Sequence, residues 1–187
     1  MSVPRYVLDA NVLYPSVLRD LLLTLASTEA FEPLWSDEII DEMRRNVLAN
    51  NPHIDPSTFA AGTIRSMQNA FPDAIVAGYE YLLATMDNDP KDRHVAAVAV
   101  HAAATGIVTY NQKDFNGEQL SNRSIRVIPP ALLIQEVFDL DPNIVANAVI
   151  AMATRKRQPP MTAAQVLKSL GKQHDFHNLS IALTPFI

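Results

Sequence analysis

Short apolar segments that alternate with helical patterns most constrain how this chain folds. Tyr6–Leu8, Ile107–Thr109 and Ile125–Ile128 are apolar and too short for a stable helix, which is typical of buried parallel strands. Phe31–Trp35 is a fourth candidate strand. Since helical patterns separate these segments, we predict an α/β fold of three layers, with a central parallel sheet and helices on both faces.

Apolar residues at helical spacing predict the connecting helices. In the first of them, Pro15–Ser27, leucine or valine recurs every three or four positions, and the proline suits the first turn. Ser36 is placed to cap the next helix, whose apolar stripe includes Ile39, Met43 and Val47. Further helices are predicted at residues 57–70, 72–84, 95–104, 131–138, 144–154 and 163–170.

The C-terminal part of the chain differs from the rest. After residue 140 the pattern is helical only, without a further candidate strand. The whole length of 187 residues is enough for one domain with a sizeable core. We therefore predict an α/β domain over residues 1–140 and a helical extension over residues 141–187.

The composition excludes several kinds of protein. The chain has no cysteine, which excludes a disulfide scaffold, thiol catalysis and cysteine-based metal sites, and fits a reducing, cytoplasmic location. No apolar run approaches the ~18 residues of a membrane span, and the N-terminus lacks a signal-peptide pattern. The net charge of −5 argues against a broad basic surface that coats nucleic acid. The excess of acidic residues lies within residues 1–129, whereas residues 130–187 are nearly balanced.

Acidic and amide side chains follow the predicted strands. Asp9 ends the first strand, Asp92 begins the helix before the third, and Asn111 and Asp114 follow the third. The carboxyl ends of parallel strands meet at one edge of a sheet, where ligands bind in open α/β folds. Glu42 lies beside the apolar stripe of its helix, from where it can reach the same edge. These side chains form a candidate acidic site.

An acidic site of this kind predicts a metal ion. Gathered carboxylates repel one another unless a cation or a proton joins them. Oxygen ligands without cysteine or paired histidine favour Mg²⁺ or Mn²⁺ over zinc. Such an ion activates a bound water for attack on phosphorus, so the predicted chemistry is phosphodiester hydrolysis without a protein nucleophile.

Structural roles are the alternative for each of these residues. Asp9, Asn111 and Asp114 also suit turns, and Asp92 also suits a helix cap. Glu42 is preferred over three neighbouring acids because two of them suit the helix dipole and the third points away from the apolar stripe. These neighbours are Asp37, Glu38 and Asp41.

Four segments carry a further resemblance: Val7-Leu8-Asp9-Ala10-Asn11-Val12-Leu13, Ser36-Asp37-Glu38-Ile39-Ile40-Asp41-Glu42-Met43, Asp89-Pro90-Lys91-Asp92-Arg93-His94-Val95-Ala96-Ala97 and Ile107-Val108-Thr109-Tyr110-Asn111-Gln112-Lys113-Asp114-Phe115. In this order, with helices between them, they resemble the PIN-domain ribonucleases. The resemblance is strongest to the VapC-like toxins of bacterial toxin–antitoxin pairs and covers residues 5–138.

The resemblance implies a compact α/β/α fold whose acidic pocket binds Mg²⁺ or Mn²⁺ and cuts RNA internally. Position by position, Asp9 and Asp92 are implied as metal-binding catalytic acids, and Glu42 as the second acid. Many family members have aspartate at the position of Asn111; here Asp114 supplies the charge, or Asn111 serves as a neutral ligand. Supporting or substrate-binding roles are predicted for Asn11, Arg93, Thr109 and Asn111.

The resemblance further implies partners for the chain. These are an RNA substrate, a second copy in a homodimer, and an antitoxin that fills the pocket and tethers the pair to operator DNA, with no membrane. Two other functions stay open. A phosphatase of the haloacid dehalogenase type also has aspartate after its first strand, but it needs a second aspartate where this chain has Asn11. A non-catalytic PIN-like binding module is the other alternative, because Asn111 departs from the family's pattern.

The histidines and the basic run receive structural interpretations. His94 and His101 share one helix face and suit surface or core positions. Arg155-Lys156-Arg157 either follows an RNA backbone or forms an exposed helix end. His174 and His177 alone do not make a metal site.

Overall fold

The computed structural model describes residues 3–156, 159–172 and 176–187. The chain divides into two compact units, each made from two stretches of sequence. The sheet unit contains residues 1–14 and 31–129, and the helical unit contains residues 15–30 and 130–187. Arg157 and His174, which the sequence analysis considered, lie outside the described residues.

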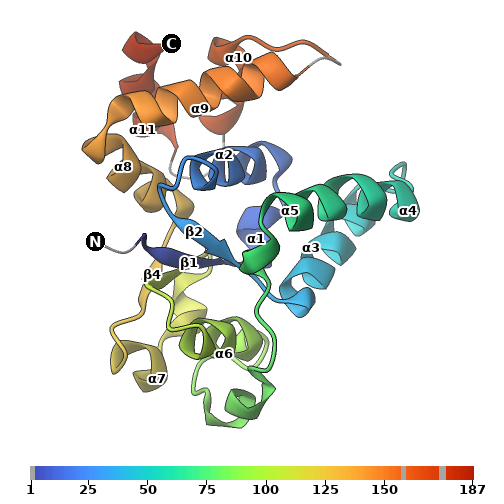
Figure 1. The fold of residues 1–187 in the computed structure, drawn as a ribbon, viewed down its shortest axis with the longest axis vertical. Coiled ribbons are helices and arrows are strands. Elements are labelled where there is room, and N and C mark those ends of the chain that lie inside the picture. Colours follow the sequence, from blue (N-terminus) through green and yellow to red (C-terminus); the bar gives the residue numbers. More distant parts are fainter. Residues whose placement is uncertain (1–2, 157–158, 173–175) are drawn as a thin grey trace. The chain divides into compact units, whose positions relative to one another are not determined.

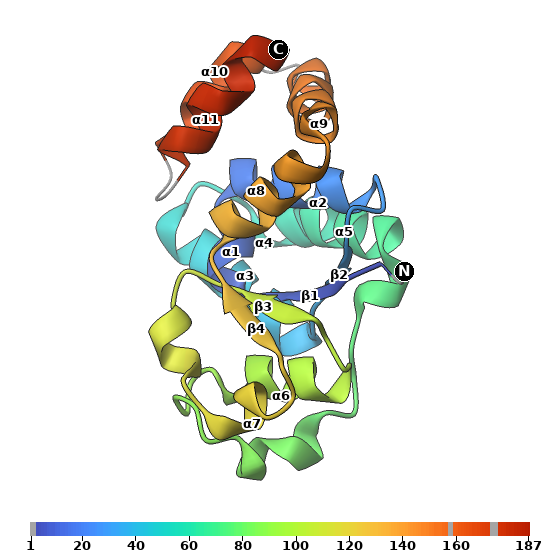
Figure 2. The same cartoon turned by 90° about the vertical axis from the view of Figure 1, so that its left-hand side faces the viewer.

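Four parallel strands form the sheet: β1 (Arg5–Leu8), β2 (Glu32–Leu34), β3 (Gly106–Val108) and β4 (Arg126–Ile128). Their order is β2–β1–β3–β4 (Figure 2), and all four predicted strands are confirmed. Val7 of β1 pairs with Leu34 on one side and with Ile107 on the other. Because β1 and β3 are parallel neighbours, the residues that follow them meet at one edge of the sheet.

Helices lie on both faces of this sheet, so the predicted α/β fold is confirmed. α6 (Arg93–His101) packs its alanine- and valine-rich sequence against β1 and β3. α1 (Ala10–Leu13) and α3 (Asp37–Asn50) contact each other on the other face (Figures 1 and 2). Ser36 caps α3 as predicted, its hydroxyl accepting from the backbone N–H of Ile39 at 3.3 Å. The unit also contains α4 (Pro56–Phe59), a π-helical turn (Ala60–Ile64), α5 (Arg65–Ala70) and α7 (Glu118–Ser121).

The helix predicted over residues 72–84 is wrong. The structure has two short 3₁₀ turns there, joined by non-helical chain. Ile75 forms an isolated parallel bridge with Trp35, which holds this part of the segment extended. Gly78 has a φ of 78°, a conformation that a right-handed helix does not contain. Pairing with Trp35 therefore overrides the helical pattern. The turns are η2 (Pro72–Ala74) and η3 (Glu80–Thr85).

The helical unit contains the leucine-rich helix α2 (Ser16–Ala26), which packs against α9 (Pro142–Arg155). Pro15 takes the cap position of α2 and not the first turn. The predicted tail helices are confirmed, and one further helix was not predicted. None of the helices in the described ranges is long and apolar enough to cross a membrane. The remaining elements are α8 (Pro130–Leu140), α10 (Ala163–Leu170), α11 (His177–Leu183) and the 3₁₀ turn η5 (Thr184–Phe186).

The compact units do not follow the boundary predicted at residue 140. Residues 15–30 and 130–140 belong to the helical unit, although the sequence analysis counted them in the N-terminal domain. A compact unit is a statement about packing, and a domain is a part that folds alone. The domain limits 1–140 and 141–187 therefore stay a prediction.

Two cations of the basic run are paired inside the helical unit. Arg155 Nη2 lies 3.0 Å from Asp20 Oδ1 and donates to Thr24 Oγ1 at 2.6 Å. Lys156 Nζ lies 3.5 Å from Asp20 Oδ2. These contacts favour the structural interpretation of the run over the interpretation that it follows an RNA backbone.

Candidate active site

Asp9 lies at the carboxyl end of β1, where the sheet buries it. Its backbone N–H donates to the carbonyl of Val108 at 3.1 Å and so extends the pairing of β1 with β3. Only 3% of the residue is exposed. Asp9 takes the cap position of α1, but its side chain makes no capping hydrogen bond. The carboxylate therefore has a role other than that of a helix cap.

Two neighbours hold the Asp9 carboxylate in place. The buried Thr109 hydroxyl donates to Asp9 Oδ2 at 2.6 Å, and Asn11 Nδ2 donates to the same oxygen at 2.7 Å. Asn11 Nδ2 also reaches Thr109 Oγ1 at 2.9 Å, which joins the three side chains in one network. Both contacts use Oδ2, so Oδ1 is the oxygen that neither of them engages. The supporting roles predicted for Asn11 and Thr109 agree with this geometry.

The surroundings of Asp9 determine the direction in which its pKa is shifted. Burial raises the pKa of Asp9 above its usual value, the Thr109 hydrogen bond lowers it, and the nearby Glu42 carboxylate raises it again. The net effect is a raised pKa. An ionised Asp9 is therefore held in a place that disfavours negative charge, as expected of a ligand for a cation.

Asp92 lies at the start of α6, where a capping role was the alternative. It takes the cap position, but its side chain makes no capping hydrogen bond. The turn before it is shaped by Asp89, whose Oδ1 accepts from the Lys91 backbone N–H at 3.0 Å. The half-buried Asp92 carboxylate therefore does not act as a helix cap.

Electrostatics connect Asp92 to the other candidate acids. Burial and the charges of neighbouring carboxylates together raise the pKa of Asp92 to about 6. Three of these carboxylates, those of Asp9, Asp114 and Glu42, are the acids that the sequence analysis grouped with Asp92. The neighbours, in order of effect, are Asp9, Asp114, Asp89 and Glu42.

Glu42 is the acid of α3 that shares this site. Its charge raises the pKa of both Asp9 and Asp92. The competing acids of α3 are engaged elsewhere or exposed. Glu38 accepts from the Tyr79 hydroxyl at 3.1 Å, and Asp41 pairs with two arginines of its own helix. Asp37 is exposed. The geometry thus agrees with the choice of Glu42 over its neighbours.

His94 takes a buried position, one of the two that the sequence analysis expected, but its contact with Glu42 was not foreseen. It is 7% exposed, and its Nε2 lies 3.6 Å from Glu42 Oε2. Within the described residues this buried nitrogen has no hydrogen-bond partner. Burial lowers the pKa of His94, but the carboxylates of Glu42, Glu38 and Asp9 raise it more, so the net pKa is raised. Its position directly after Asp92 and Arg93 was the available signal.

Asp114 and Asn111 lie on the turn after β3, in different settings. Asp114 is half-buried in the 3₁₀ turn η4 (Gln112–Phe115), and its charge raises the pKa of Asp92. Asn111 is exposed, and its backbone N–H donates to Thr109 Oγ1 at 3.0 Å. This geometry favours Asp114 as the charged member. We call Asp9, Glu42, Asp92 and Asp114 the acidic cluster.

The donor chemistry of the acidic cluster fits a hard divalent ion. All of its candidate ligand atoms are carboxylate oxygens, and burial together with the neighbouring carboxylates raises the pKa of Asp92. In the described part of the chain, no three acidic or histidine side chains are drawn together closely enough to enclose a metal ion. Asp9 is fixed by its network, whereas Glu42, Asp92 and Asp114 are half-buried and border solvent.

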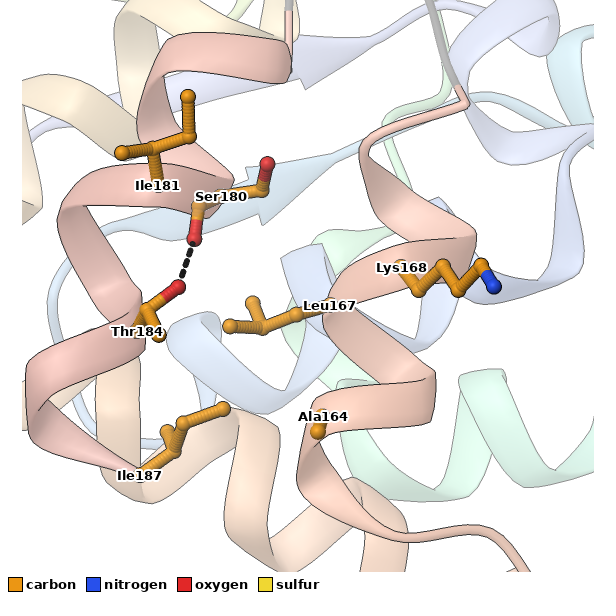
Figure 3. A pocket seen from close by; sticks show the side chains of 7 residues that line it. All are labelled: Ala164, Leu167, Lys168, Ser180, Ile181, Thr184 and Ile187. Atoms are coloured by element: carbon orange, nitrogen blue, oxygen red, sulfur yellow. Dashed lines mark hydrogen bonds between the residues drawn. The ribbon is translucent and has the colours of Figure 1, made fainter.

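Two hollows in the described part of the chain differ in their lining. One, of about 510 Å³, lies between η3 and the start of α6, beside the acidic cluster. The other, of about 230 Å³, lies between α10 and α11 in the helical unit. Figure 3 shows Leu167 and Ile187 pointing toward each other across the second hollow, while Lys168 points away. The lining of this second hollow contains Lys168 but no carboxylate, so the candidate acids lie in the sheet unit.

Comparisons with known proteins agree with this location. A family model described as "PIN domain" matches residues 5–113, and one described as "VapC50 C-terminal domain" matches residues 132–174. Over 108 residues the chain is 34% identical to a protein of Mycobacterium tuberculosis named "Putative ribonuclease VapC50". That alignment covers 58% of this chain and 64% of the relative, which is less than two thirds of its length. No solved structure matches the chain.

Proposed function

The chain belongs to the PIN-domain family, and on that basis we propose that it is a metal-dependent endoribonuclease. The observation that carries the proposal is the acidic cluster, whose members come from four separate segments. Burial first, and then repulsion from neighbouring carboxylates, raises the pKa of Asp92 to about 6. A bound divalent ion would offset this repulsion, which explains why the carboxylates lie close together. The name of the Mycobacterium tuberculosis relative supports RNA as the substrate.

The residues of this chain have distinct tasks in the proposed reaction. Thr109 and Asn11 hold Asp9 through Oδ2 and so present Oδ1 to the ion. Glu42 and Asp92 complete the charge that binds the ion, together with Asp114. An Mg²⁺ or Mn²⁺ ion held by these carboxylates would supply Lewis-acid chemistry, activating water and offsetting negative charge on the phosphodiester.

Asn11 argues against a phosphatase of the haloacid dehalogenase type. That chemistry needs a carboxylic acid two residues after the first aspartate. Here the position holds an amide whose Nδ2 donates to Asp9 Oδ2 at 2.7 Å. Asn11 therefore orients Asp9 and carries no proton for a leaving group. The other alternative, a non-catalytic binding module, is distinguished from an enzyme by the RNA cleavage assay described next.

The test is RNA cleavage by the purified protein with Mg²⁺ or Mn²⁺ and with a chelator. We expect internal cuts that need the ion, with RNA ends mapped by sequencing, and no cuts by the Asp9→Asn variant. Asp37→Asn, which removes an exposed carboxylate from α3, serves as the charge-matched control and keeps activity. Equal cleavage by wild type and Asp9→Asn would refute the proposal, and so would absence of cleavage with either ion.

The proposed partners follow from the family resemblance. We propose that the chain is the toxin of a cytoplasmic toxin–antitoxin pair, acts as a homodimer, and reaches operator DNA only through its antitoxin. Growth arrest on expression, relieved by a small neighbouring gene, tests the pair. Light scattering of the purified chain tests the dimer.

A further inference from the structure

A hollow beside the acidic cluster has a lining suited to one part of a nucleic-acid strand. It measures about 510 Å³, within the ~300–1,000 Å³ range of ligand pockets. Lys91, Arg93 and His94 line it from the start of α6, and Leu83 and Ala84 line it from η3. Pro90 and Glu38 complete the lining. We call it the α6 hollow.

The α6 hollow adjoins the acidic cluster through the chain itself. Asp92 lies between Lys91 and Arg93, two residues that line the hollow. His94 lines the hollow and contacts Glu42 of the cluster at 3.6 Å. A strand whose phosphodiester lies at the cluster thus has its neighbouring nucleotide at the hollow.

Charge distinguishes the hollow from the cluster. The cluster is wholly acidic, whereas the hollow has two cations against the single carboxylate of Glu38. Three arginines of the sheet unit are paired, Arg5 with Glu32 and both Arg44 and Arg45 with Asp41. Among the described residues, the exposed Lys91 ammonium forms no ion pair. An unpaired cation next to an acidic site is placed to attract a phosphate.

The remaining lining suits a sugar or a base. Leu83, Ala84 and Pro90 form an apolar wall next to the two cations. Single-stranded RNA offers a phosphate and an unstacked base at the same nucleotide, while duplex RNA keeps its bases stacked inside. The combination of cation and apolar wall therefore favours a single strand.

We propose that the α6 hollow binds the nucleotide of single-stranded RNA that adjoins the bond to be cut. Lys91 and Arg93 contact its phosphate, and the wall of Leu83, Ala84 and Pro90 packs against its sugar or base. This inference rests on the proposed function, because RNA must be the substrate of the acidic cluster.

The test measures RNA binding in the Asp9→Asn background, where no cleavage occurs. Fluorescence anisotropy of a labelled single-stranded RNA is recorded with Mg²⁺ present. We expect Lys91→Ala to weaken binding about 5–10-fold and to reduce the salt dependence by about one phosphate contact. Arg65→Ala, which removes an exposed cation from α5, leaves binding unchanged. Equal effects of the two variants would overturn the proposal.

A second pair of variants fills the hollow and keeps its cations. Ala84→Glu places a carboxylate in the wall, and Ala61→Glu places the same group at an exposed alanine outside the hollow. We expect about 10-fold weaker binding for the first and wild-type binding for the second. Fluorescence of the single buried Trp35 confirms that each variant is folded. Unchanged binding by Ala84→Glu would also overturn the proposal.

Failure of this inference is distinct from failure of the proposed function. If wild type cuts RNA and both Lys91→Ala and Ala84→Glu keep its KM, the hollow does not bind RNA and the nuclease proposal stands. If wild type cuts no RNA but these variants lose binding as expected, the hollow stands as a binding site and the nuclease proposal falls.

Discussion

The two compact units of the chain bury different kinds of side chain. Among the described residues, the buried polar and charged side chains belong to the sheet unit with one exception, Thr24 of the helical unit. Thr24 is satisfied locally, since its hydroxyl donates to the Asp20 carbonyl and accepts from Arg155. In the sheet unit, Asp9 is buried near the like charge of Glu42, and the buried His94 Nε2 has no hydrogen-bond partner among the described residues.

The difference shows that the groups expected to lower the free energy of unfolding lie in the sheet unit, near the candidate site. A buried polar group costs free energy unless its hydrogen bonds are made, and buried like charges cost more. The helical unit avoids both costs by pairing Asp20 with Arg155 and Lys156 near the surface. In the sheet unit, burial and neighbouring carboxylates raise the pKa of Asp92 to about 6, which is the cost of gathering like charges. Electrostatic repulsion of this kind is expected at a site where a bound ligand offsets it.

The largest expected effect separates acids of the two units. Asp92→Asn is expected to lower RNA cleavage by about 10³-fold or more, because it removes an ion-binding carboxylate. Asp20→Asn in the helical unit makes the same chemical change and is expected to leave cleavage unchanged. Initial rates on one labelled RNA measure both. Similar losses in the two variants would break the contrast between the units.

The next effect concerns the network around Asp9. Thr109→Val removes the hydroxyl that donates to Asp9 Oδ2 and is expected to lower ion affinity and cleavage about 10–100-fold. Thr109→Ser keeps the hydroxyl and is expected to stay close to wild type. The measurement is cleavage as a function of Mn²⁺ concentration. If Thr109→Ser lowers cleavage as much as Thr109→Val does, the effect comes from changed packing, and the hydrogen bond that orients Asp9 does not explain it.

A smaller effect concerns stability and pH. The pKa of Asp92 is about 6 in the folded chain against a usual 3.8, so the folded state holds this proton more tightly. The resulting stabilisation is present below pH 3.8 and is lost as pH rises through 6. After allowance for solvent screening it amounts to about 1 kcal/mol. Urea unfolding without metal, at pH 5 and pH 7.5, is expected to show this loss in wild type and not in Asp92→Asn. If the free energy of unfolding depends on pH in the same way in both proteins, the raised pKa of Asp92 is contradicted.

The smallest effect concerns the ion pairs of the helical unit. Arg155→Ala removes its contacts with Asp20 and Thr24 and is expected to lower the free energy of unfolding by at most about 1 kcal/mol. RNA cleavage is expected to stay at the wild-type level. A normal Tm with weakened RNA binding would instead assign the basic run to RNA.

Local patterns predicted the parts of the fold that depend on local sequence. The strands β1 and β3 follow from short apolar runs, and the cap of α3 follows from Ser36. The convergence of Asp9 with Asp92 was expected because parallel strands, which alternation of strands and helices predicts, bring their carboxyl ends to one edge of the sheet. These features need no knowledge of which side chains meet.

Features that depend on tertiary contacts were not predictable in this way. The segment around Ile75 has a helical pattern, but pairing with Trp35 overrides it. The environment of His94 depends on Glu42 of another helix. The grouping of α2 with the C-terminal helices depends on contacts across more than a hundred residues of sequence. For the same reason, the choice between Asn111 and Asp114 needed the burial and charge of the folded site.

Titration of the metal-free protein with Mn²⁺ tests the central claim most directly. The account predicts that wild type binds the ion and that Asp92→Asn binds it at least about 10-fold more weakly. Asp20→Asn, with the same change of charge in the helical unit, is predicted to bind like wild type. If Asp92→Asn binds as tightly as wild type, or Asp20→Asn loses as much affinity, the acidic cluster is not the ion site.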